Sequence, residues 1–246
     1  MVLPQREKVL FRLFGVPVKA SFSWLFLVAL LWCNLALAHF PNVLGAQEPA
    51  YVYWGLGFVA TMGLFASLIV HELCHCLVAR YTGVSVAGIT LFIFGGVSQL
   101  EGEPPTAPAE FFMAIAGPAS SIALGCFFLA FWLVASALGW SPLVWSVAQL
   151  LFFMNFALAA FNSLPAFPLD GGRVLRSLLW SVSNDLAIAT RIAAHVGTFF
   201  ATGLMMLGLF SLFKHALVQG LWFLVLGYFL RRAALGSLLM LIERQR

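Results

Sequence analysis

Long apolar runs limit this chain to a membrane-spanning fold. The run from Tyr51 to Val70 contains no charged residue, and a stretch of that length can cross the hydrocarbon core as one α-helix. Of the 246 residues, 62% are hydrophobic and 9% are charged, whereas a soluble domain is about one-quarter charged. The runs are also longer than the alternating segments of a membrane β-barrel. The sequence therefore predicts an all-α polytopic membrane protein.

Six such runs predict six transmembrane helices in a single transmembrane domain, residues 1–246. The predicted spans cover about residues 20–40, 51–80, 109–138, 143–164, 188–213 and 216–239. The division between the last two spans depends on Lys214 and His215, which interrupt an otherwise continuous apolar stretch.

Basic residues fall on one side of this predicted arrangement. If the N-terminus lies inside, only Lys214 of the basic residues falls in an outside loop, and the inside segments hold the other twelve. The twelve are Arg6, Lys8, Arg12, Lys19, Arg80, Arg173, Arg176, Arg191, Arg231, Arg232, Arg244 and Arg246. Because Lys and Arg are enriched in cytoplasmic loops, both termini are predicted to be cytoplasmic. The net charge of +4 follows from this bias and requires no nucleic-acid partner.

A metal-binding pattern, H-E-x-x-H, lies in the second predicted span and begins at His71. On a helix, His71 and His75 share one face and can bind one ion together. Glu72 lies at the edge of that face, where a general base can reach a metal-activated water. Such polar groups are costly to bury in a membrane unless they are satisfied, and a metal ion would satisfy them. The structural alternative is a pair of histidines that bond to Glu72 within a helix bundle.

A catalytic zinc usually has three protein ligands, so one more is needed. Asp170 lies in a stretch after the fourth predicted span in which two prolines and two glycines interrupt the apolar sequence. Irregular backbone at that level is tolerated where it is buried in protein or lines a wet cavity. As an alternative, Asp170 could cap a cytoplasmic helix. The local sequence favours both equally, and the missing third ligand favours the metal. Cys74 and Cys76 converge less well with the histidines and are predicted not to bind it.

The predicted topology brings the two motifs to the same membrane depth. If Arg80 marks the cytoplasmic interface, His75 lies about 7 Å and His71 about 13 Å inward, at 1.5 Å per residue. Asp170 follows a span that ends on the same side. The predicted site is therefore about two helical turns from the cytoplasm and is wetted from there.

The two motifs resemble those of the site-2 protease family of intramembrane metalloproteases, in its compact six-span branch. The resemblance rests on the pentad that begins at His71 and on the stretch from Asn162 to Gly171, and it extends over most of the chain. It implies that one Zn²⁺ is bound by His71, His75 and Asp170, that Glu72 is the catalytic base, and that Asn162 positions the substrate or stabilises the oxyanion.

Residues 84–100 are rich in β-branched and aromatic side chains and contain Gly95-Gly96. They predict a short membrane-associated β-hairpin or sheet between the second and third spans. An exposed strand edge could pair with an extended peptide, and a helical substrate must unwind before its carbonyls can react. The resemblance implies that a sheet with a Gly-Gly element holds the unwound substrate, which makes Gly95 and Gly96 candidate substrate-binding residues. The alternative is a purely structural hairpin that seals the cavity.

These features predict an intramembrane zinc metalloendopeptidase, in a prokaryotic cell membrane, that cuts single-span or membrane-associated proteins near the cytoplasmic face. A metal transporter or sensor that uses the His pair is the main alternative, but it would need more intramembrane acids and histidines. A catalytically silent scaffold is a third. Many members of the compact branch have an additional C-terminal regulatory domain, so such a domain or a regulatory protein is a further expected partner, besides the lipid bilayer.

Several other residues have specific expectations. Ala116-Gly117-Pro118 is predicted to kink the third span and to allow it to pack closely near the second. Asn155 is predicted to form an interhelical hydrogen bond, with a place in the lining of the same cavity as Asn162 as the alternative. His195 is predicted to form a helix–helix contact. Glu110 is predicted to lie in a solvated loop together with Glu101 and Glu103.

Overall fold

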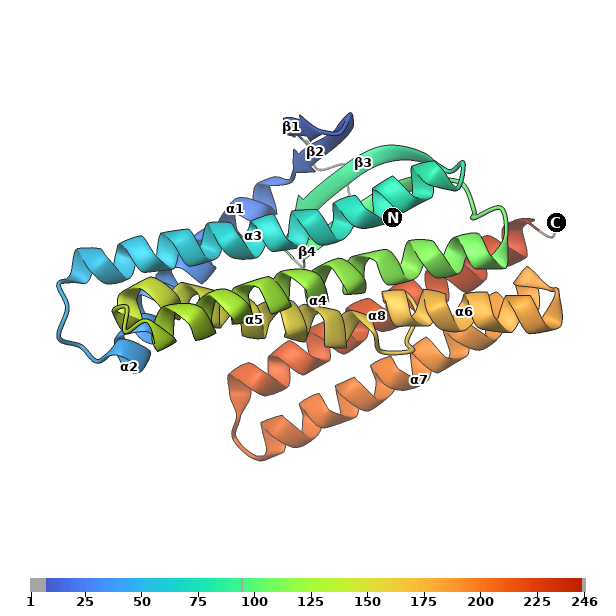
Figure 1. Ribbon diagram of the computed structural model, residues 1–246. Helices are drawn as coiled ribbons and strands as arrows, with labels where there is room; N and C mark the ends of the chain where they lie inside the picture. The colour runs from blue at the N-terminus through green and yellow to red at the C-terminus, as the bar shows by residue number, and fades with distance from the viewer. Residues whose placement is uncertain (1–7, 94, 245–246) are drawn as a thin grey trace. The chain divides into compact units, whose positions relative to one another are not determined.

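The computed structural model describes residues 8–93 and 95–244 (Figure 1). Arg6, Phe94 and Arg246, which entered the predictions above, lie outside the described residues, as does the side chain of Arg244. The described chain forms two compact units. The first comprises residues up to Glu103 together with Ala116–Ala159, and the second comprises Pro104–Ile115 together with the residues from Ala160 onward. The expectation of a single functional domain stays a prediction.

Within the described residues, six helical segments are long and apolar enough to cross a membrane. They are Phe22–Leu44 (α1, Phe22–Asn34; the π-helix η1, Leu35–His39; α2, Phe40–Leu44), α3 (Ala50–Tyr81), α4 (Ala107–Ala137), α5 (Pro142–Asn162), α7 (Leu186–Phe213) and Leu217–Leu239 within α8 (Leu217–Arg244). The six predicted spans are confirmed to within a few residues. The division at Lys214 and His215 is also confirmed, because α7 ends just before Lys214 and His215 has a positive φ of 62°.

A four-stranded sheet belongs to the first unit, with strand order β1-β2-β3-β4. The predicted hairpin is present as β3 (Ser85–Phe92) and β4 (Gly95–Glu101), which pair antiparallel. The chain also supplies β1 (Lys8–Leu13) and β2 (Val16–Ala20), and β2 pairs parallel with β3. These two N-terminal strands were not predicted.

The sheet packs against the part of α3 that carries the histidine motif. Val16 and Val18 of β2 and Ile89 of β3 are fully buried in one cluster with Leu73 and Cys76 of α3. The same helix also lies beside β4 in Figure 1. This close-packed cluster holds the sheet against the helical turns that carry the motif.

The second unit contains α6 (Asp170–Ser183), α7 and α8. Helices α7 and α8 form an antiparallel pair (Figure 1). Glycines allow their backbones to approach: a Cβ added at Gly208 would lie 2.9 Å from the carbonyl oxygen of Gly220. Small residues are the usual means by which membrane helices pack closely.

Candidate metal centre

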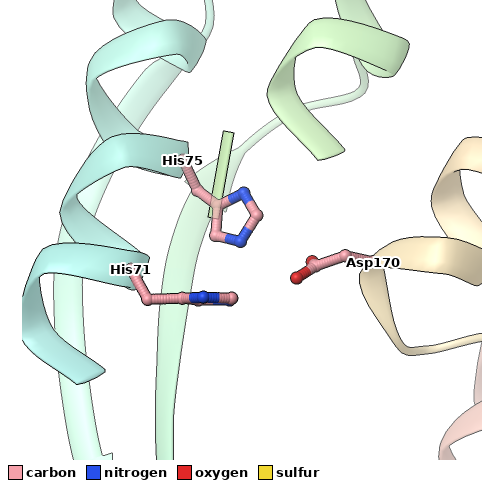
Figure 2. A group of neighbouring side chains, drawn as sticks. All are labelled: His71, His75 and Asp170. Atoms are coloured by element: carbon pink, nitrogen blue, oxygen red, sulfur yellow. The ribbon is translucent and has the colours of Figure 1, made fainter. Parts of the chain in front are cut away.

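Helix α3 presents two buried imidazoles on one face. His71 is 2% exposed and His75 is 3% exposed, and their ring centroids lie 4.9 Å apart with the rings nearly perpendicular. Figure 2 shows both side chains projecting from the same side of the helix. The i, i+4 spacing therefore produces the paired arrangement that the sequence predicts.

Ser121 of α4 orients the first imidazole. Its Oγ lies 2.9 Å from Nδ1 of His71, and Ser121 is fully buried. A hydrogen bond at Nδ1 fixes the ring and leaves Nε2 as the metal-binding nitrogen, as is common for histidine ligands. Sequence reasoning missed Ser121. Its position four residues after Gly117, on the same helix face, is the signal that could have found it.

The Nε2 atoms of both histidines converge on the bare backbone of Gly117. A Cβ added at Gly117 would overlap Nε2 of His75 and lie 2.6 Å from Nε2 of His71. The predicted close packing at Gly117 is confirmed. The position requires glycine, because a side chain here would occupy the place where the two imidazole nitrogens meet. Two buried imidazole nitrogens directed at one point fit a zinc ion.

Glu72 is half-buried at the edge of the imidazole face, next to β4. The Ser98 hydroxyl donates a hydrogen bond of 2.6 Å to its Oε2, and a Cβ added at Gly96 would lie 3.0 Å from its Cγ. The strand backbone therefore lies against the carboxylate side chain. Gly95 has no atom within 4 Å of its added Cβ, but its φ of +128° suits glycine alone.

Asp170 is the first residue of α6, in the second unit (Figure 2). The N-cap is Leu169, without a side-chain cap hydrogen bond, so the alternative prediction that Asp170 caps this helix is wrong. Side chains would not fit at the next two positions: a Cβ on Gly171 would overlap the Ser163 carbonyl oxygen, and one on Gly172 would overlap the Phe167 backbone. The loop after α5 is thus folded tightly over the helix start, and this packing fixes the backbone that carries Asp170.

A buried ion pair also holds α6 in place. Glu110, in the first turn of α4, is fully buried. Its Oε1 accepts hydrogen bonds from Nε of Arg176 at 2.7 Å and from Nη2 of the same side chain, and Nε of Arg173 lies 3.9 Å away. The prediction of a solvated loop is wrong for Glu110, although Glu101 and Glu103 are exposed. A buried carboxylate needs such a partner, so this pair fastens α6 to the start of α4.

The remaining predicted residues have mixed outcomes. Asn162 ends α5 and is half-buried in the second unit. Asn155 donates a 3.0 Å hydrogen bond to Ser67 of α3, which confirms the interhelical bond. His195 is exposed and bonds to the Arg191 carbonyl of its own helix, so the predicted helix–helix contact is wrong. Among the described residues, no group of side chains able to hold a metal ion includes a cysteine.

Comparisons with known proteins agree on one family. The model of peptidase family M50 matches residues 59–138 and 135–204. The "Putative zinc metalloprotease Rip3" of Mycobacterium tuberculosis is 41% identical over 91% of this chain and 56% of its own length. The "Putative zinc metalloprotease sll0528" of Synechocystis is 36% identical over 92% of this chain and 58% of its own length. The chain thus spans a little over half the length of these curated relatives.

A solved structure gives the same result. The site-2 protease from Methanocaldococcus jannaschii matches with a TM-score of 0.58 and 25% identity, over 94% of this chain and 95% of that one. The match extends over nearly the whole of both chains.

Proposed function

We propose that this chain, which belongs to peptidase family M50, is an intramembrane zinc protease that hydrolyses peptide bonds of membrane-anchored or membrane-associated proteins. The chain is an integral membrane protein with a site-2 protease fold. The observation that carries the proposal is the convergence of both histidine Nε2 atoms on Gly117, next to Glu72, inside a helix long enough to cross the membrane.

In this proposal, His71, His75 and Asp170 bind one zinc ion. Each offers one ligand atom, a ring nitrogen or a carboxylate oxygen (Figure 2). Two neutral imidazoles and one carboxylate are a donor set of catalytic zinc sites, which leave the fourth position open. The relatives' names as zinc metalloproteases support the choice of metal.

Each side chain around the site has its own proposed role in peptide-bond hydrolysis. When bound, zinc activates a water and polarises the scissile carbonyl. Glu72 takes a proton from the attacking water and returns it to the leaving amine. Ser121 holds His71 in the orientation that binds metal. We assign substrate positioning to Asn162, and to Gly95 and Gly96 the close approach of an unwound peptide to β4.

The substrate is proposed to enter from the cytoplasmic side. The distribution of Lys and Arg supports cytoplasmic termini, and this orientation brings His75 near the cytoplasmic end of α3. A single-span protein whose helix has unwound near that face is the substrate class that fits. The prokaryotic cell membrane is the proposed location, and a regulatory domain or protein remains a proposed partner.

Zinc transport is not favoured, because the matching family is a peptidase family and the curated relatives are named zinc metalloproteases. Transport would also use acids and histidines on several spans. A silent scaffold would not need to keep Glu72 beside the histidines.

Metal removal tests the proposed function. We expect the purified protein, stripped with a chelator, to lose cleavage of a single-span substrate almost completely, because the nucleophilic water is then no longer activated. One equivalent of Zn²⁺ should restore cleavage, and Mg²⁺ should not, since imidazole ligands suit zinc rather than magnesium. Gel analysis of the cleaved fragment gives the rate. Undiminished cleavage by the stripped protein, with its zinc content measured as zero, would contradict the proposal.

A further inference from the structure

We propose that Ser98 is a positioning residue for the general base, and that it connects the edge strand of the sheet directly to Glu72. This inference rests on the proposed function. Ser98 lies on β4, and its hydroxyl is 2.6 Å from Oε2 of Glu72. The same hydroxyl lies 3.1 Å from the Glu72 backbone carbonyl and 3.4 Å from Sγ of Cys76. A hydroxyl has one proton to donate, and the short bond to the carboxylate is the strongest of its options.

The register of the sheet places Ser98 where it can act. Successive side chains on a strand point to opposite faces, so Gly96 and Ser98 face Glu72 together. Gly96 provides the clearance, because its added Cβ would lie 3.0 Å from Glu72 Cγ. Ser98 provides the bond. Strand β4 therefore constrains the Glu72 carboxylate in two ways, by the close contact at Gly96 and by the hydrogen bond from Ser98.

Packing in the first unit holds Ser98 in place. Ser98 pairs with Ile89 of β3, and Ile89 is fully buried in the cluster with Leu73 and Cys76 of α3. The strand and the helix are thus packed together directly around the bond. A support held by packing keeps a catalytic group near its productive geometry.

This arrangement gives the edge strand a second role. Within the described residues, β4 pairs only with β3, so its other edge can receive an extended peptide. A peptide that pairs there lies along the same strand that holds Glu72. Ser98 engages one carboxylate oxygen, and a carboxylate has a second oxygen that can accept the proton of the attacking water. Strand β4 would therefore position both the substrate peptide and the general base, Glu72.

The test compares four forms of the 246-residue chain in detergent with a single-span substrate: wild type, Ser98→Ala, Ser98→Thr and Gln99→Ala. We expect Ser98→Ala to lower kcat about tenfold, the loss of one hydrogen bond to a charged group, with KM and the zinc content unchanged. Ser98→Thr keeps the hydroxyl and should recover most of the rate. Gln99→Ala is the matched control, because its side chain belongs to the opposite strand face and bonds to Lys19.

A double-mutant cycle separates positioning from general structure. If Ser98 acts through Glu72, then Ser98→Ala causes no further loss in a Glu72→Gln background, because the interaction is already lost. An additive loss, a raised KM at constant kcat, a loss of zinc, or a wild-type kcat in Ser98→Ala would each overturn the inference. Wild-type cleavage no faster than that of Glu72→Gln would instead refute the proposed function, and the inference with it.

Discussion

Replacement of Glu72 by Gln is expected to abolish proteolysis while zinc remains bound. Gln has the same shape but cannot accept the proton of the attacking water, and general-base catalysis contributes about 10²- to 10⁴-fold. We therefore expect cleavage of a single-span substrate to fall about 1,000-fold. Metal analysis of the purified variant should still give one zinc per chain, because Glu72 is not among the proposed ligands.

The matched control for this variant is Glu101→Gln. Glu101 ends β4 and is exposed, so the control removes the same charge at a position away from the histidines. Its cleavage rate should equal that of wild type. Cleavage by Glu72→Gln at the wild-type rate would contradict the protease mechanism, and zinc uptake into vesicles that survives Glu72→Gln but not His71→Ala would support transport.

The second large effect is expected from a single methyl group. Gly117→Ala places a Cβ where the Nε2 atoms of His71 and His75 converge. Either the imidazole rings turn away or α4 shifts. In both cases the two Nε2 atoms no longer point at one metal position. We expect zinc affinity to fall about 100-fold, the upper end of what changes around a metal's ligands cause, with a matching loss of cleavage. Competition with a zinc-binding dye measures the affinity.

Gly55→Ala is the control for Gly117→Ala. Gly55 lies in α3, and its added Cβ would have no atom within 4 Å, so zinc affinity and cleavage should remain as in wild type. Thermal unfolding of both variants checks that the chain is folded. A folded Gly117→Ala protein with wild-type zinc affinity would show that the metal does not bind where the imidazoles converge.

The spans and the histidine pair could be predicted because their signals are local. A membrane helix needs about twenty apolar residues in succession, and the i, i+4 spacing determines the helix face without knowledge of any neighbour. The hairpin of β3 and β4 was predictable for the same reason, because its two strands are adjacent in sequence.

The partners that support the site could not be predicted because they are distant in sequence. Strand β2 is short, and its pairing partner at Val18 is Ile89. Glu110 follows a proline-rich segment that resembles a loop, and its buried state depends on Arg176 of another helix. Ser98 and Ser121 are ordinary residues whose roles appear only when β4 and α4 lie against α3. Nothing in the local sequence of Ser98 distinguishes it from other serines, and the spacing of four residues from Gly117 is the one local signal for Ser121.

The most direct test of the proposed zinc site is X-ray absorption of zinc-loaded Asp170→Cys protein. Wild type should show only nitrogen and oxygen ligands, and Asp170→Cys should gain one sulfur at about 2.3 Å. Asp185→Cys is the control, because Asp185 caps α7 by accepting bonds from backbone amides, and it should add no sulfur. A zinc-loaded Asp170→Cys protein with the wild-type ligand shell would contradict the assignment of Asp170 as the third ligand.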